Sequence, residues 1–190
     1  GYAPQVYFVY DSNTDNGVLF GDVKGDGLED NLRSHKSSSS VVTKEVWLNT
    51  GLSFVRAGTN LDPPELFFDA NDGGDIGTRL VDFNGDGIVD ILNARQGDPK
   101  RTYMGAGDNW INVSGTAWNS PVDFVLTGGV DNGVRLYDAN GDGLIDIIQD
   151  QANSSGSTRK TWLNTGDGWA SADTWQSPEG FIDNGNNIGR

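Results

Sequence analysis

A repeated, acidic and glycine-rich segment of nine residues is the strongest constraint on the fold of this chain. The segments DVKGDGLED (22–30), DFNGDGIVD (82–90) and DANGDGLID (138–146) align without gaps, at offsets of 60 and 56 residues. A period of this size is typical of proteins that stack copies of one small structural unit. The chain is therefore expected to be an array of repeats.

Other features recur in phase with this segment and define the unit. A Pro followed three residues later by an aromatic residue begins each unit, at Pro4–Tyr7, Pro64–Phe67, Pro121–Phe124 and, a fourth time, Pro178–Phe181. An aromatic residue in an apolar run recurs downstream, at Trp47, Tyr103 and Trp162, and is interpreted as core rather than as a sugar-stacking platform. We predict repeats at 4–63, 64–120 and 121–177, with 178–190 as the start of a fourth.

Within a unit, short apolar or alternating runs are separated by Gly, Asn and Asp, and no run has helical period and length. This pattern predicts an all-β chain of tandem four-stranded antiparallel sheets. In the third unit the expected strands are 122–126, 133–138, 144–150 and 159–164, with a polar hairpin loop between the last two. Blades of β-propeller type fit best, although a solenoid of small sheets would leave the same pattern.

The second and third nine-residue segments have the ligand order of a calcium loop. Oxygen donors occur at positions 1, 3, 5, 7 (through the carbonyl) and 9 of such loops, and hard oxygen donors favour Ca²⁺. The predicted ligands are Asp82, Asn84, Asp86, Ile88 and Asp90 in the second loop, and Asp138, Asn140, Asp142, Leu144 and Asp146 in the third. The simpler alternative is a tight hairpin turn, since Asn-Gly and Asp-Gly are strong turn dipeptides.

The first segment departs from the other two at position 3, where Lys24 replaces Asn. An ammonium group does not coordinate a cation. Two alternatives follow: a weakened site, or a metal-free loop in which Lys24 takes the place of the ion. The ligands of the weakened site would be Asp22, Asp26, Leu28 and Asp30.

Charge and composition limit the partners of the chain. Thirteen Lys and Arg stand against 27 Asp and Glu, for a formal net charge of -14. A surface for nucleic acid or anionic lipid needs clustered basic residues, so neither partner is expected. The chain has no Cys, a single His (His35) in a Ser-rich segment, and no HExxH, P-loop or GxSxG motif, so no enzyme is expected. No apolar run approaches the roughly 20 residues that span a bilayer.

The run VRLYDANGDGLIDIIQD, followed by KTWLNTGDGW, resembles the VCBS/FG-GAP repeat family, which occurs in integrin α-chain propellers, fungal lectins and bacterial surface and toxin proteins. The resemblance covers nearly the whole chain. It implies propeller blades that bind Ca²⁺ in a loop between strands, and a role in adhesion or binding.

These observations predict a secreted, extracellular, calcium-binding protein with a structural or adhesive role. The repeat restarts at 178, which suggests a piece of a longer propeller, head-to-tail self-association into a ring or filament, or an isolated monomer. The alternative function is that of a lectin, with glycans as partners; Trp118 and Trp175 are expected to pack rather than to contact a ligand. Two N-glycosylation sequons begin at Asn112 and Asn153.

Overall fold

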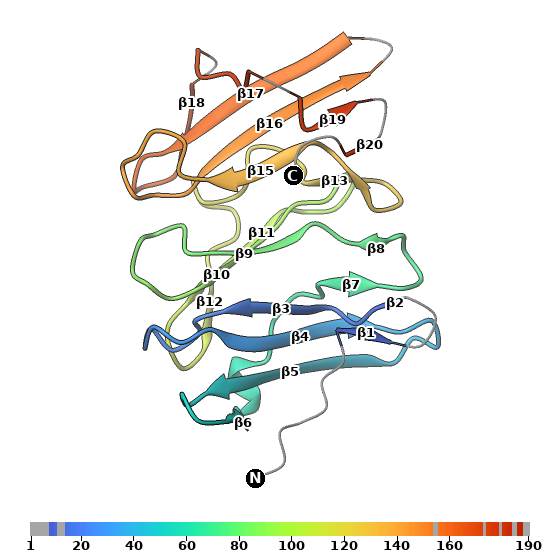
Figure 1. Cartoon of the computed structure of the whole chain (residues 1–190), viewed down its shortest axis with the longest axis vertical. Helices are drawn as coiled ribbons and strands as arrows, with labels where there is room; N and C mark the ends of the chain where they lie inside the picture. The colour runs from blue at the N-terminus through green and yellow to red at the C-terminus, as the bar shows by residue number, and fades with distance from the viewer. Residues whose placement is uncertain are drawn as a thin grey trace.

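Three four-stranded antiparallel sheets follow one another along the chain and form a stack in the computed structural model (Figure 1). The structure describes residues 8–10, 14–153, 156–172, 174–178, 180–183 and 186–187. The first sheet contains β3 (Val18–Gly21), β4 (Asp30–Lys36), β5 (Val42–Asn49) and β6 (Phe54–Arg56). The second contains β9 (Thr78–Val81), β10 (Asp90–Asn93), β11 (Arg101–Gly105) and β12 (Trp110–Asn112). The third contains β15 (Val134–Tyr137), β16 (Asp146–Asn153), β17 (Gly156–Asn164) and β18 (Trp169–Ser171).

A two-stranded hairpin begins each unit, and the second, third and fourth hairpins lie beside the sheet of the unit before them. β7 pairs in parallel with β4, β19 pairs in parallel with β16, and a single bridge joins Arg95 to Val125 of β13. The four hairpins are β1–β2 (Val9–Tyr10, Thr14–Asp15), β7–β8 (Phe68–Asp69, Gly74–Asp75), β13–β14 (Val125–Leu126, Val130–Asp131) and β19–β20 (Ile182–Asp183, Asn186–Asn187). Consecutive units are therefore joined by backbone pairing as well as by side chains.

The expectation of all-β, four-stranded antiparallel blades is confirmed, but one expected strand belongs elsewhere. The run 122–126 lies in the hairpin β13–β14, because the turn around Gly128 and Gly129 folds it back onto residues 130–131. The fourth strand of the sheet is instead β18, whose residues follow the TGDG turn and pair with β17. The expected polar loop is shorter than predicted, since β16 and β17 extend to Asn153 and Gly156; Ser154 and Ser155 lie outside the described residues.

Two apolar clusters fill the spaces between successive sheets. The first joins Val23, Leu32 and Val46 of the first unit to Val89 and Ile91 of the second. The second joins Phe83 and Leu92 of the second unit to Val134 and Ile147 of the third, with Trp118, Trp162 and Trp169 packed against it. Tyr103 packs against the first cluster, so Tyr103 and Trp162 are core residues, as predicted. β10 of the second unit thus contributes to both clusters, through Ile91 to the first and through Leu92 to the second.

The hairpin of the first unit lies one residue out of the predicted register. The amide of Asn16 donates to the carbonyl of Phe8 over 3.1 Å, as the amide of Asn132 does to the carbonyl of Phe124 over 3.1 Å. Phe8, rather than Tyr7, therefore has the position of Phe124. Pro4 and Tyr7 lie outside the described residues.

The described residues contain one 3₁₀ turn, η2 (Thr59–Leu61), and none of them forms a helix long and apolar enough to cross a membrane.

Candidate functional site

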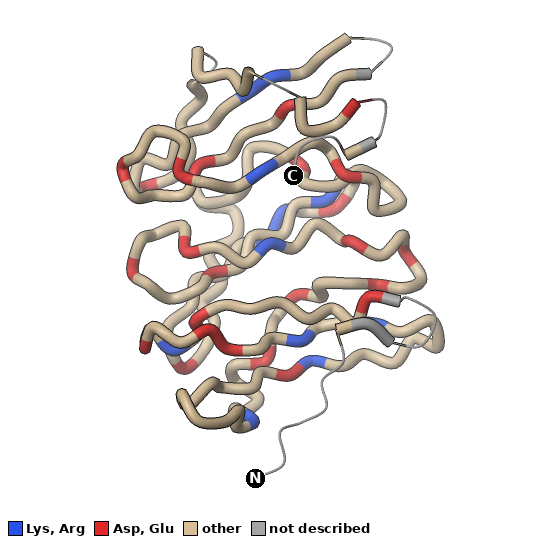
Figure 2. The backbone as a smooth tube through the Cα atoms, viewed as in Figure 1, with Lys and Arg blue, Asp and Glu red and all other residues tan. Residues whose placement is uncertain are grey.

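The three nine-residue segments form loops at one edge of the stack, where each joins the first strand of a sheet to the second (Figure 1). Acidic residues recur along this edge, at the left of Figure 2. Consecutive loops are in contact, because a Cβ atom on Gly25 would lie 3.0 Å from Ile88 Cγ1 and one on Gly85 would lie 3.1 Å from Leu144 Cδ2. The residue at position 7 of each loop therefore packs on the glycine at position 4 of the loop before it.

Hydrogen bonds within the second loop hold its oxygen-bearing side chains close together. Asp82 Oδ1 accepts from the amides of Gly85 (2.7 Å) and Asp86 (3.2 Å), and Asp82 Oδ2 accepts from Gly87 (2.8 Å). Asn84 Nδ2 donates to Asp86 Oδ2 over 2.9 Å. The third loop repeats these bonds at Asp138, Asn140 and Asp142, with an Asn140–Asp142 distance of 2.7 Å.

The carboxylate at position 9 is fully buried in all three loops, at Asp30, Asp90 and Asp146. In each case one oxygen accepts from the amide of the second loop residue and the other from an amide at the end of the third strand. For Asp90 these donors are Phe83 (3.1 Å) and Gly105 (2.8 Å). This carboxylate therefore ties its loop to the body of the sheet.

The pKa of Asp90 is raised from its ordinary value of 3.8 to about 7, mainly by burial; the charges of Asp86 and Asp82 also raise it, and the hydrogen bonds from the amides of Gly105 and Phe83 lower it. Burial also raises the pKa of Asp30. By contrast, the amide of Leu144 and the side chain of Asn140 lower the pKa of Asp142. The loop carboxylates thus concentrate negative charge in each loop, and a bound cation would neutralise that charge.

Lys24 in the first loop points away from the loop. Its Nζ donates to the carbonyl of Gly107, in the β11–β12 turn of the second unit, over 2.6 Å. Asp22 binds the amides of Gly25 (2.7 Å) and Gly27 (2.6 Å) as its counterparts do. The first loop therefore has the fold of the other two without an amide at position 3, and its lysine links two units.

The donor chemistry of the second and third loops fits a hard cation. A carboxylate offers about four lone-pair positions, so oxygens that accept an amide proton retain capacity for a metal. Among the described residues, however, no group of three or more acidic or His side chains lies together as a metal site. The side chains of Asp82, Asn84 and Asp86 share one hydrogen-bonded loop, and Asp90 lies behind them, bound to backbone amides. The predicted carbonyl ligands Ile88 and Leu144 occupy the seventh positions.

A pocket lies between the first and second units, on the hairpin side of the sheets. It has a volume of about 240 Å³, and Leu19, Phe67 and Phe68 form its apolar part. Asp15, Asp75, Thr78 and Arg79 are its polar lining residues. Arg79 Nη1 and Nη2 donate to the two carboxylate oxygens of Asp75 over 3.0 and 2.9 Å, so the guanidinium is held in place.

Sequence reasoning did not predict this pocket, which results from one difference between units. Arg79 stacks over Phe124 at 5.7 Å, and Arg135 stacks over Phe181 at 5.4 Å. Leu19 has the position of these two arginines in the first unit, as the strand pairings β3–β4, β9–β10 and β15–β16 show. Leucine is shorter than arginine, and the pocket lies where Leu19 borders Phe68.

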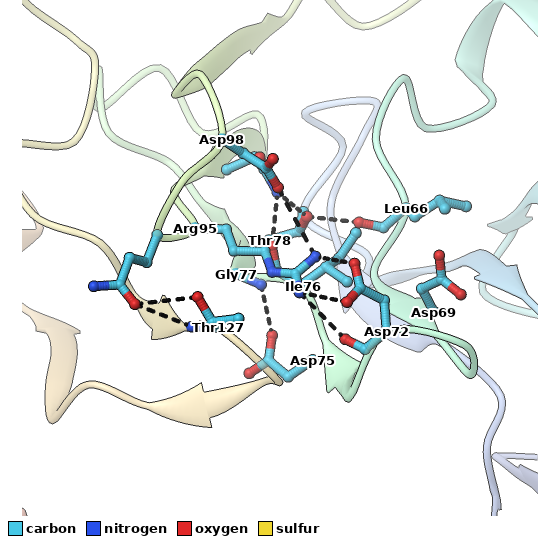
Figure 3. A network of polar contacts seen from close by, with 12 residues as sticks. Leu66, Asp69, Asp72, Asp75, Ile76, Gly77, Thr78, Arg95, Asp98 and Thr127 are labelled. Carbon is cyan, nitrogen blue, oxygen red and sulfur yellow. Dashed lines mark hydrogen bonds and ion pairs between the residues drawn. The ribbon is translucent and has the colours of Figure 1, made fainter.

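A polar network continues from this pocket along the hairpins (Figure 3). Arg95 donates to both carboxylate oxygens of Asp72, and its guanidinium lies 3.8 Å from Asp98. This pairing lowers the pKa of Asp72. Thr78 Oγ1 donates to the carbonyl of Leu66 over 2.6 Å. Asp75 and Thr78 belong to this network and also line the pocket. The network was not predicted, because the residues that it joins are not neighbours in the sequence.

The remaining predicted features have the following positions. Trp118 packs between Phe83 (ring centroids 4.6 Å apart) and Trp169 (5.9 Å), whereas Trp175 is 48% exposed. Asn112 is exposed at the end of β12 and accepts from the amide of Ser114. Asn153 ends β16, and the described residues give no position for its side chain. His35 is half-buried in β4 rather than in the serine loop, and burial lowers its pKa.

Comparison with known proteins relates the chain to two propeller-like folds. A lectin from Agrocybe aegerita, described as recognising non-reducing terminal N-acetylglucosamine, matches with a TM-score of 0.52 at 20% identity, over 80% of this chain and 37% of the lectin. The Tc holotoxin pore of Photorhabdus luminescens matches with a TM-score of 0.50 at 20% identity, over 86% of this chain and 7% of the toxin chain. No established family profile and no curated protein sequence matches. At these identities the likeness concerns the fold alone.

Proposed function

We propose that this chain is a non-enzymatic, extracellular array of propeller-like blades that Ca²⁺ stabilises and that has a structural or adhesive role. The observation that carries the proposal is the buried carboxylate at Asp90, which lies behind two further carboxylates of its own loop and has a strongly raised pKa. A buried charge of this kind destabilises a fold unless a proton or a cation compensates it.

Calcium would supply that compensation at the second and third loops. Asp82, Asn84, Asp86 and the carbonyl of Ile88 would hold the ion, and Asp90 would connect it to the sheet through its amide bonds. Because consecutive loops pack on one another, order in one loop would stabilise its neighbours. Modules of this kind bind Ca²⁺ with dissociation constants of about 10⁻⁴ to 10⁻³ M, which suits the extracellular space.

Thermal unfolding with calcium and with a chelator tests the proposal. We expect chelation to lower the melting temperature of the wild type. The variants Asp86→Ala and Asp142→Ala should each remove a large part of the calcium effect, whereas Asp26→Ala in the first loop should remove little. Equal losses in all three variants, or no calcium effect in the wild type, would contradict the assignment.

A second candidate function is carbohydrate binding, and the pocket between the first and second units favours it. The partly exposed ring of Phe68 offers an apolar surface for the C–H face of a sugar, while Asp15, Asp75 and Arg79 offer charged hydrogen-bonding groups. The volume of about 240 Å³ lies below the roughly 300 Å³ at which pockets for larger ligands begin, so it suits a single sugar ring. The lectin named above, which has a similar fold, binds terminal N-acetylglucosamine.

A glycan array, followed by titration of any sugar that binds, tests this second function. Arg79→Leu should abolish binding, because it removes a guanidinium from the pocket. The matched control is Arg135→Leu, which makes the same change at the equivalent position of the third unit, outside the pocket. Binding that is lost equally in both variants, or an array without a specific signal, would reject the pocket as a sugar site.

A further inference from the structure

One type of interface occurs twice inside this chain, between the first and second units and between the second and third. We call the face of a sheet toward the preceding unit its leading face, and the face toward the following unit its trailing face. Leading residues of the second unit, such as Ile91, share the first apolar cluster with trailing residues of the first, such as Leu32. The second cluster repeats this arrangement with Ile147 and Leu92.

The leading face of the first unit exposes residues whose equivalents are buried in the other units. Phe8 is 54% exposed, whereas Phe67 is 6% and Phe124 is 1% exposed. Phe20 is 47% exposed, whereas Leu80, at the same register position of the second unit, packs against the first cluster. The rings of Phe8 and Phe20 lie 5.6 Å apart and form one apolar patch.

Two polar atoms of this leading face are buried without a hydrogen-bond partner: Asn31 Oδ1 and Trp47 Nε1. The two residues are directly opposite on β4 and β5. Their equivalents are satisfied or apolar: the hydroxyl of Tyr103 donates over 2.9 Å to Glu65, in the segment that begins its own unit, and Ile91 is part of the first cluster, which includes residues of the preceding unit. The exposed Phe20 ring and these two unpaired atoms distinguish the leading face of the first unit from those of the second and third units.

The trailing face of the third unit is exposed in a complementary way. Trp175 is 48% exposed, whereas Trp118, at the same position of the second unit, packs against Trp169 of the third. A Cβ atom on Gly141 would have no atom within 4 Å, whereas its equivalents Gly25 and Gly85 lie under Ile88 and Leu144.

We propose that the trailing face of the third unit binds the leading face of the first unit of a second copy of this chain, so that copies associate head to tail. In this arrangement Leu28 of one copy packs on Gly141 of the other, as Ile88 packs on Gly25, and Phe54 meets Trp175, as Trp169 meets Trp118. This inference deepens the self-association expected from the sequence and rests on the structural role proposed above.

A difference in sequence between the units, at a pair of positions that meet across each interface, supports the match between the two faces. Val89 contacts Gly21 across the first interface, and the equivalents of these residues across the second are Ile145 and Val81. At the proposed junction the pair becomes Glu29 and Tyr137. Tyr137 is 42% exposed, and its hydroxyl is a donor for the carboxylate of Glu29. In the proposed junction, a tyrosine and a glutamate that would form a hydrogen bond thus stand where the two interfaces within the chain have an apolar pair.

The fourth hairpin determines how the second copy docks. β19–β20 already occupies the position on β16 that β7–β8 occupies on β4, and Phe181 lies under Arg135 as Phe124 lies under Arg79. The incoming copy therefore contributes its four-stranded sheet, with Phe20 as the exposed ring that the contact would bury, while its β1–β2 hairpin with Phe8 would stay outside the position that β19–β20 holds. Such a heterologous contact gives a ring if the rotation closes and a filament if it does not.

Light scattering and analytical ultracentrifugation of the wild type and two single variants test this arrangement. Phe20→Asp damages only the leading face and Trp175→Asp only the trailing face; both side chains are exposed, so both variants should fold. We expect wild type to form assemblies larger than a dimer, and each variant alone to associate on the order of 30-fold more weakly. Ile111→Asp, in β12 of the second unit and 49% exposed, is the control that should assemble like wild type, because neither face of the second unit takes part in the proposed contact.

Mixing the two variants gives the decisive result, because one intact leading face and one intact trailing face remain. A head-to-tail contact predicts a one-to-one dimer that grows no further. A monomeric wild type, a mixture that stays monomeric, or full assembly of either variant alone would overturn the proposal. Each sample is measured with calcium and with chelator, so that a calcium-stabilised but monomeric wild type rejects the docking while leaving the proposed calcium sites in place.

Discussion

The buried carboxylate of Asp90 gives the most quantitative prediction, which concerns stability against pH in the absence of calcium. Burial raises the pKa of Asp90 in the folded chain to about 7, against 3.8 for the free side chain. Between these two pH values the folded chain retains a proton that the unfolded chain releases, so the contribution of Asp90 to stability falls as the pH rises. Three pKa units correspond to about 4 kcal/mol.

Asp90→Asn removes this titration. At pH 4 the variant should be less stable than wild type by about 1–3 kcal/mol, because the asparagine amide accepts from only one of the two backbone donors, Phe83 and Gly105. By pH 8, with chelator present, wild type loses about 4 kcal/mol that the variant does not lose. The difference between the two proteins should therefore vanish or change sign.

The measurement is urea unfolding followed by tryptophan fluorescence, at pH 4, 6 and 8. Asp98→Asn, whose side chain is 48% exposed, is the matched control and should show no such convergence with wild type. With calcium at pH 8, wild type should again be the more stable protein. A difference between wild type and Asp90→Asn that is the same at pH 4 and pH 8 in chelator would refute the reasoning.

Three further substitutions, one of them with a control variant, test the contacts between units, each by urea unfolding. Gly73→Ala should lower the free energy of unfolding by about 2–5 kcal/mol, because Gly73 has a φ of 81° and a Cβ atom there would lie 2.2 Å from the carbonyl oxygen of Gly128. Gly97→Ala is the control: with a φ of 90° and no atom within 4 Å of its Cβ, it should lose only about 1–2 kcal/mol through backbone strain. Trp118→Ala should cost about 3–5 kcal/mol, since it empties the space between two aromatic rings; a cost below that of a surface substitution would contradict the packing. Lys24→Met should cost about 0.5–1.5 kcal/mol through the lost bond to Gly107 without changing calcium binding, and a gain in calcium affinity would show that the ammonium acts on the ion.

The architecture could be predicted because it depends on short-range signals. The repeat of the nine-residue segments fixed the number of units, and the absence of helical periodicity fixed their class. The strand composition of each unit was harder to predict, since the run 122–126 is as apolar as the strands of the sheet. Only the turn at Gly128 and Gly129 assigns it to a hairpin, and the tertiary pairing with the preceding unit confirms that position.

The candidate sites were predictable only in part. Spacing predicts that Asp82, Asn84 and Asp86 share one loop, and the structure places them together. Spacing does not predict that the amide of Gly105, fifteen residues away, reaches Asp90, because that contact requires β11 to pair beside β10. The pocket was unpredictable for a similar reason, since it depends on the length of one side chain, Leu19, relative to rings from the next unit.

Isothermal titration of the chelator-treated chain with Ca²⁺ tests the central claim most directly. The account predicts about two binding sites per chain, with dissociation constants of about 10⁻⁴ to 10⁻³ M. It further predicts that Asp86→Ala and Asp142→Ala each remove one site. Titration heats that do not differ from those of dilution, or a stoichiometry unchanged by both substitutions, would contradict it.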